Sequence, residues 1–300
     1  MENTPPRKRT RRDNAGFNST AAPHIDGKKM ARSAALSDAE VGQTNNQQEQ
    51  AIENTKQQPF FSAPSIIKWL LLGFWSIYAV LLILPRNYSE LLGVHLALSP
   101  VDLFSAGNLT FQDRATGLIG HMFVHSGFQH IATNSLLFLA FGVPVVRRLS
   151  SVDRQPPPFL ERFVAQQATF GVSLLFLAFF ILSGIAGAFL FSILYYDERV
   201  LLVGASGGVS GLFGGIVRMI NRSAGQFTPG LRPLAPLTDP IVWILSGVFI
   251  VLNIAQGLFG VGLGPGEQVD IAWEAHLGGF FFGLLSFPFF DKLAQSLNQK

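Results

Sequence analysis

Residues 201–217 read LLVGASGGVSGLFGGIV, an apolar run without a charged side chain in which glycine recurs at positions 207, 211 and 215. Small residues spaced four apart lie on one face of a helix and let a second helix approach closely within a membrane. Gly279 and Gly283 have the same spacing in a second apolar run, residues 275–290. We therefore expect these two segments to pack against each other as membrane-spanning helices.

The whole chain has the composition of a membrane protein. Of its 300 residues, 48% are hydrophobic and 14% are charged, against roughly 25% charged in an average soluble domain. A helix pairs its own backbone groups in lipid, and no alternating pattern indicates a barrel. The sequence therefore predicts an all-α, polytopic membrane protein with six transmembrane helices. The six expected spans are Trp69–Leu84, Ala115–Val146, Val164–Tyr196, Val200–Val217, Ile241–Gly260 and Ala275–Phe290.

The first 60 residues differ from the rest, because they hold 9 of the 22 Lys and Arg residues and few large apolar ones. Such a segment cannot bury enough surface to offset the entropy of ordering. We expect a disordered tail over residues 1–60, a transmembrane domain over 61–291 and a short C-terminal tail over 292–300. With Lys68 set aside as interfacial, basic residues divide 18 to 3 between the two sides. The positive-inside rule then predicts cytosolic termini, in the plasma membrane if the protein is bacterial.

Several classes of protein are disfavoured by what the chain lacks. Cysteine is absent, which excludes disulfides, thiolate metal sites and cysteine nucleophiles. No basic stripe with interleaved aromatic residues indicates nucleic acid binding. His121 and His125 have the spacing of the H-E-x-x-H zinc motif, but Met122 replaces its glutamate. We therefore expect neither a metal nor another cofactor.

Polar side chains concentrate in the outer halves of the even-numbered spans. Ser206 and His276 are expected at a common depth, and a serine whose proton is taken by an imidazole is the minimum for nucleophilic acyl transfer. His130 and Asn134, four residues apart, lie on one helix face and can both donate hydrogen bonds to a developing oxyanion. Glu274, two residues before His276, points to another side of the helix. A catalytic dyad is therefore expected.

These residues resemble those of the rhomboid family of intramembrane serine proteases over about residues 65–291. The resemblance is carried by His125, His130 and Asn134, by Gly204-Ala205-Ser206-Gly207, and by Ala275-His276-Leu277-Gly278-Gly279 with Gly283. It implies a dyad of Ser206 and His276. It also implies an oxyanion hole made by the Ser206 backbone N–H with the side chains of His130 and Asn134, and supporting roles for His125, Gly204 and Gly207.

The resemblance further implies a serine endopeptidase that acts in the lipid bilayer. Its substrates would be membrane proteins, usually with a single transmembrane span, cleaved within or near that helix through an acyl-enzyme. Many members carry a bulky residue four positions after the nucleophile, beneath the catalytic imidazole. This chain has Ser210 there, so the sequence leaves open what holds the His276 ring.

Other functions fit parts of the pattern. Residues 204–208 match the G-x-S-x-G elbow of α/β-hydrolases, but no strand pattern precedes them. A transporter would show paired repeats with charged residues at mid-depth, which the chain lacks. A non-catalytic rhomboid-like protein that binds membrane clients stays the alternative, although such proteins usually lack the serine or the histidine.

Overall fold

The computed structural model describes residues 63–104, 110–150, 161–220, 233–259 and 272–298, and the tail expected over residues 1–60 lies outside them. The chain divides after Ser62, and the unit described below begins at Ala63. Within the described ranges the only β pairing is an isolated bridge between Leu98 and Leu202, so the predicted all-α class is confirmed. The helices are α2 (Ser65–Ile83), α3 (Arg86–Leu96), α4 (Pro100–Phe104), α5 (Phe111–Gly120), the 3-10 turn η1 (His121–Phe123), α6 (Phe128–Leu149), α7 (Glu161–Leu194), α8 (Ser206–Met219), α9 (Pro240–Phe259) and α10 (Trp273–Asn298).

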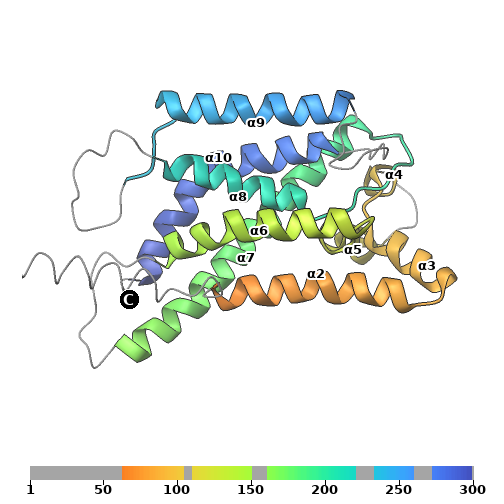
Figure 1. Ribbon diagram of the computed structural model, residues 1–300, viewed down its shortest axis with the longest axis horizontal. Coiled ribbons are helices and arrows are strands. Elements are labelled where there is room, and N and C mark those ends of the chain that lie inside the picture. Colours follow the sequence, from red (N-terminus) through yellow and green to blue (C-terminus); the bar gives the residue numbers. More distant parts are fainter. Residues whose placement is uncertain (1–62, 105–109, 151–160, 221–232, 260–271, 299–300) are drawn as a thin grey trace, which may run out of the picture. The chain divides into compact units, whose positions relative to one another are not determined.

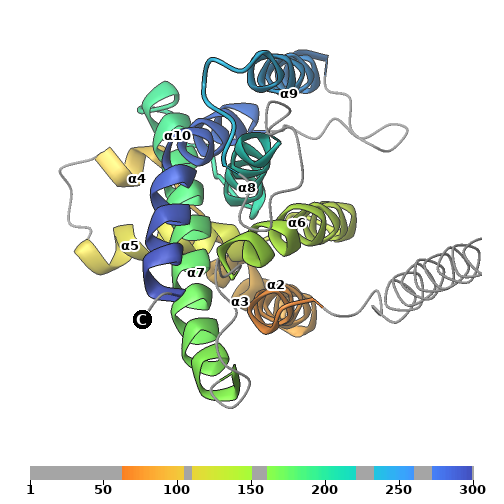
Figure 2. The same cartoon turned by 90° about the vertical axis from the view of Figure 1, so that its left-hand side faces the viewer.

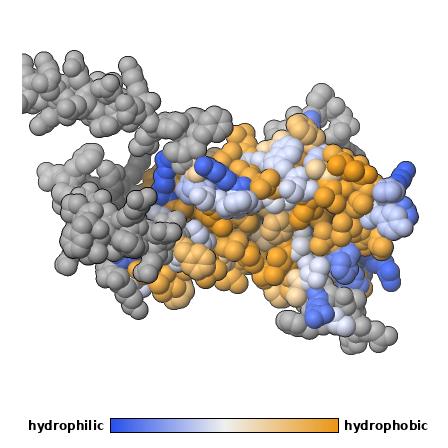
Figure 3. Space-filling view, turned by 90° about the horizontal axis from the view of Figure 1, so that it is seen from below, coloured by the Kyte–Doolittle hydropathy of each residue, from blue (hydrophilic) through white to orange (hydrophobic). Residues whose placement is uncertain are grey.

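The longer helices α2, α6, α7, α8, α9 and α10 run side by side, and the short helices α3, α4 and α5 gather near one end of the bundle (Figure 1). Viewed end-on, α8 lies among α6, α7 and α10, whereas α2 and α9 lie at the periphery (Figure 2). In the part of the chain that the structure describes, five helices, α2, α6, α7, α9 and α10, are long and apolar enough to cross a membrane. One face of the unit is mostly apolar, and the strongly hydrophilic side chains lie toward its two ends (Figure 3).

The central helix α8 is shorter than the sequence suggests. The expected span begins at Val200, but the helix begins at Ser206, because Gly204 takes the left-handed conformation with φ 113° and interrupts a helix there. Its 14 residues rise about 21 Å, less than the roughly 30 Å hydrocarbon core. Nine of them are buried. Non-helical backbone is tolerated at membrane depth where protein surrounds it, so Ser206 lies at a helix start inside the bundle.

The second expected span is also divided. The run Ala115–Val146 was expected as one helix, but α5, η1 and a short extended segment precede α6. In a continuous helix the His121 carbonyl would accept from the N–H four residues later. Here it accepts from Gly204 at 2.7 Å and from Val124 at 3.3 Å. Ser126 and Gly127, both weak helix formers, follow the break. His121 and His125 therefore precede the span.

The glycine residues bring α8 and α10 into backbone contact, as the sequence predicts. A Cβ atom added to Gly279 would overlap the carbonyl oxygen of Gly207, and one added to Gly283 would overlap that of Gly211. A flexible side chain could rotate away from an added Cβ atom, but the backbone of the facing helix cannot. The two helices α8 and α10 can therefore lie this close only because glycine, which has no Cβ atom, occupies these four positions.

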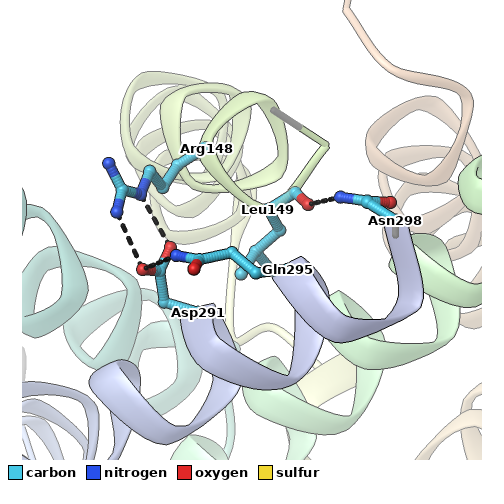
Figure 4. A network of polar contacts seen from close by, with 5 residues as sticks. All are labelled: Arg148, Leu149, Asp291, Gln295 and Asn298. Carbon is cyan, nitrogen blue, oxygen red and sulfur yellow. Dashed lines mark hydrogen bonds and ion pairs between the residues drawn. The ribbon is translucent and has the colours of Figure 1, made fainter. Parts of the chain in front are cut away.

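The C-terminal helix continues beyond the expected boundary at residue 291. Asp291 accepts two hydrogen bonds from Arg148, Nε to Oδ1 at 2.7 Å and Nη2 to Oδ2 at 2.8 Å, and a third from Gln295 at 2.9 Å (Figure 4). Asn298 Nδ2 donates to the carbonyl of Leu149 at 2.9 Å, which satisfies a carbonyl that the end of α6 leaves without an intrahelical donor. These contacts hold residues 292–298 as a continuation of α10, and the boundary expected at residue 291 stays a prediction.

A proline in α10 creates a carbonyl that another helix satisfies. Pro288 has no N–H, so the Leu284 carbonyl four residues earlier lacks its intrahelical donor. Arg218, in the last turn of α8, donates from Nη1 to that carbonyl at 3.1 Å and from Nε to the carbonyl of Ala235 at 2.8 Å. Arg218 thus links α8, the segment before α9 and the proline turn of α10.

We expect Arg218→Met to destabilise the protein by about 1–3 kcal/mol, because it leaves buried carbonyls without a donor. Pro288→Ala returns an N–H to Leu284 and removes part of this need. The cost of Arg218→Met should therefore be smaller in the Pro288→Ala background, which thermal unfolding of the four proteins in detergent would measure as a double-mutant cycle. Equal costs in both backgrounds would contradict the link.

Candidate active site

Ser206 is the first residue of α8, where backbone N–H groups have no intrahelical partner. The approach to it is fixed on both sides. The Gly204 N–H donates to the His121 carbonyl at 2.7 Å, and Leu202 exchanges two backbone hydrogen bonds with Leu98, at 2.8 and 3.1 Å. The segments before α6 and after α3 thus position the start of α8.

His130, in the first turn of α6, lies beside this helix start. A Cβ atom on Gly204 would lie 2.6 Å from His130 Nε2 and 3.7 Å from Ser206 Oγ. Nε2 and Oγ are therefore at most about 6.3 Å apart, the sum of these two distances. Only glycine fits at position 204, because of both its φ and the histidine ring.

The hydrogen bonds of His130 define its tautomer. The backbone N–H of Ser126 donates to Nδ1 at 3.4 Å, and the Ser126 hydroxyl lies 3.0 Å from the same nitrogen. Because a backbone N–H can only donate, Nδ1 accepts, and in the neutral ring the hydrogen then resides on Nε2. The N–H of the ring is therefore the one near Gly204 and Ser206.

Asn134 lies one turn further along α6 and is buried. Its Nδ2 donates to the carbonyl of His130 at 3.0 Å. An amide nitrogen carries two hydrogens, so this bond uses one of them. The shared face predicted for His130 and Asn134 is present.

His276 lies in the first turn of α10, next to Ala275, whose carbonyl contacts the start of α8. A Cβ atom on Gly207 would lie 3.4 Å from the Ala275 carbonyl, so Ser206 and His276 each adjoin a residue of that contact. The neighbouring Glu274 accepts a hydrogen bond at its Oε1 from the Tyr195 hydroxyl, at 2.7 Å.

The His276 ring meets a residue that sequence reasoning missed. Nδ1 lies 2.8 Å from Oδ1 of Asn253 on α9. A signal was available, since Asn253 is one of the few polar residues in the mostly apolar run 241–260 and polar groups inside membranes commonly mark function. Ser210, four residues after Ser206, is buried in α8.

Two further histidines support the region from outside the spans. The His125 ring packs 5.1 Å from the His130 ring and 5.8 Å from that of Phe74, measured between centroids. Burial first, and the nearby His130 second, lower the pKa of His125 to about 4. His121 has Nδ1 3.0 Å from the Gly117 carbonyl, and burial lowers its pKa to about 4. Both rings are therefore neutral at pH 7.

The bundle and its buried polar residues define a multi-pass integral membrane protein with a serine at an internal helix start. The family model described as Rhomboid domain matches residues 112–291, more than half of the chain. The chain therefore belongs to the rhomboid family, and the resemblance read from the motifs is confirmed. Members of this family are generally serine proteases that act on membrane proteins within the bilayer.

Proposed function

We propose that the protein is an intramembrane serine endopeptidase with Ser206 as nucleophile and His276 as general base. The observation that carries the proposal is the convergence at the start of α8. There the Ser206 hydroxyl, the Nε2–H of His130 and the backbone contact beside His276 come together around Gly204 and Gly207. Gly204 and Gly207 admit the neighbouring ring and helix, and His125 packs against His130.

The proposed reaction follows from these groups. Ser206 Oγ attacks the scissile carbonyl carbon while His276 Nε2 takes its proton. The resulting oxyanion accepts from the Ser206 backbone N–H, His130 Nε2–H and the second amide hydrogen of Asn134. The C–N bond then breaks as His276 returns the proton to the leaving amine. Water, deprotonated by His276, hydrolyses the acyl-enzyme and regenerates Ser206.

The proposed substrates are single-span membrane proteins that reach the site through the lipid bilayer. The start of α8 lies inside the bundle, and its neighbours are helices long enough to cross a membrane. A peptide bond within a regular helix has its carbonyl hydrogen-bonded, so the substrate must unwind locally before Ser206 can attack. The non-catalytic alternative, binding of a membrane client, requires neither unwinding nor an activated serine.

Fluorophosphonate labelling of the purified wild-type protein tests the proposal without knowledge of the substrate. The probe reacts with a serine whose proton is taken by a base, and we expect one adduct, mapped by mass spectrometry to the peptide that contains Ser206. Folded protein that takes up no probe, and that co-purifies with an uncleaved membrane client, would favour the alternative.

The oxyanion assignment predicts a graded loss of activity. His130→Ala and Asn134→Ala should each lower kcat by about 10²- to 10³-fold, because each removes one preorganised donor. Turnover of a single-span reporter in detergent or liposomes measures this. Gln129→Ala, an exposed neighbour on α6, is the matched control and should leave kcat unchanged. Wild-type kcat in both site variants would make the two residues structural.

Orientation is a further part of the proposal, with both termini in the cytosol. The native chain has no cysteine, so single cysteines report accessibility without background. We expect Asp197→Cys, an exposed position between α7 and α8, to react with an impermeant maleimide on intact cells. Ser296→Cys, exposed near the end of α10, should react only after permeabilisation. The reverse pattern would place the termini outside.

A further inference from the structure

Asn253 is an inward-facing polar residue on α9, a helix at the periphery of the bundle. Its neighbours Val251 and Leu252 are 65% and 59% exposed, whereas Asn253 is 6% exposed. A buried amide in an apolar span is costly unless it is hydrogen-bonded. Both ends of this amide have partners, and the partners lie on two different helices.

The two hydrogen bonds of Asn253 define which way its amide points. Nδ2 donates to the carbonyl of Phe249, one turn earlier in α9, at 2.8 Å. A carbonyl oxygen can only accept, so the nitrogen must be the atom that faces Phe249. Oδ1 is then the atom 2.8 Å from His276 Nδ1.

The orientation of the amide in turn determines the hydrogen on His276. Oδ1 can only accept, so Nδ1 must carry a hydrogen and donate it. A neutral imidazole carries one ring hydrogen, so Nε2 has none and keeps a free lone pair. His276 therefore has the tautomer opposite to that of His130, whose Nε2 carries the hydrogen.

We propose that Asn253 is a positioning residue, which holds His276 in the tautomer and rotamer that a general base for Ser206 requires. This rests on the proposed function. It also accounts for the absence of a bulky residue at Ser210, because a hydrogen bond from α9 replaces packing from α8. An amide can serve in this way, as asparagine does beside the histidine of papain-like cysteine proteases.

Two substitutions of matched shape separate the acceptor from the packing. Asn253→Leu keeps the branched shape and the number of side-chain heavy atoms and suits an apolar span, but it has no acceptor, whereas Asn253→Asp retains one toward Nδ1. We expect Asn253→Leu to lower kcat by about 10- to 100-fold with little change in KM or Tm. The substitution misorients the His276 base but leaves substrate binding unaffected. The rate of fluorophosphonate labelling should fall in parallel, and Asn253→Asp should recover most of the loss.

Ser246→Ala is the matched control. Ser246 is buried on the same face of α9, seven residues earlier, and its hydroxyl has no hydrogen-bond partner among the described residues. Its removal should leave kcat, KM and Tm unchanged. An equal loss of kcat in Ser246→Ala and Asn253→Leu would mean that α9 packing matters and the Asn253 acceptor does not, which would overturn the proposal.

The tautomer itself is measured by ¹⁵N NMR of histidine-labelled protein, with the His276 signals identified by their absence in His276→Gln. We expect Nδ1 to be protonated in the wild type and the population to shift toward Nε2 in Asn253→Leu. Protonation at Nε2 in the wild type would overturn the proposal even if Asn253→Leu failed to fold, as would wild-type kcat in Asn253→Leu. Activity in Ser206→Ala would instead refute the proposed protease, so the two failures are distinguishable.

Discussion

Ser206→Ala is expected to abolish cleavage of a single-span reporter, with a loss in kcat of roughly 10⁴- to 10⁶-fold, as found when a serine protease loses its nucleophile. Labelling by a fluorophosphonate should vanish with it. The variant should keep its fold, because removing one hydroxyl from a half-buried position changes little packing. Reporter turnover in liposomes and thermal unfolding in detergent measure the two quantities on the same preparations.

His276→Ala should lose as much activity as Ser206→Ala, and the double variant should lose no more than either. Residues that act as a unit give strongly non-additive losses, which two independent contributions would not. The control is Ser246→Ala, for which wild-type turnover is expected. Cleavage at the wild-type rate by Ser206→Ala, or additive losses in the double variant, would be incompatible with the proposed dyad.

The second large effect concerns stability. Gly283→Ala should destabilise the protein by about 3 kcal/mol or more, at or above the usual cost of overpacking, because its methyl group would overlap the backbone of Gly211. Two helices would have to separate to admit it. We expect a low yield of monodisperse protein and a lowered Tm, and Gly279→Ala should behave alike through the Gly207 carbonyl.

Gly247→Ala is the matched control, because a Cβ atom there meets nothing within 4 Å. Alanine has the higher helix propensity by about 1 kcal/mol, so Tm should stay the same or rise. If Gly283→Ala and Gly247→Ala have the same Tm, the contact between α8 and α10 is not as close as described. If Gly279→Ala folds, its turnover should still fall, because Gly279 packs beside the residues adjoining Ser206 and His276.

Local patterns predicted the features that depend on local physics. Apolar runs predicted the helical spans, and glycines four apart predicted the contact between α8 and α10, since both signals come from one face of one helix. The start of α8 at Ser206 and the break before α6 were missed. Both depend on the hydrogen bond between Gly204 and the His121 carbonyl, which joins residues far apart in the chain.

The candidate site was predicted to a similar extent. The shared face of His130 and Asn134 follows from helix periodicity, whereas the partner of His276 does not. Asn253 lies 23 residues earlier on another helix, and an apolar span carries little information about its rotation around its own axis. The roles of Ser206, His276, His130 and Asn134 in catalysis stay predictions until the variants above are measured.

The polar network at the far end of α10 bears on where the protein can be cut or tagged. The family match ends at residue 291 and begins at 112. A chain trimmed at residue 291 would lose Gln295 and Asn298. A chain that began at residue 112 would lose α2 and with it Phe74, whose ring contacts those of Phe123, Phe138, Phe180 and His125. For crystallisation or reconstitution we therefore expect a piece from about residue 63 to residue 298 to be more stable than one trimmed to the family match, with affinity tags placed outside both ends.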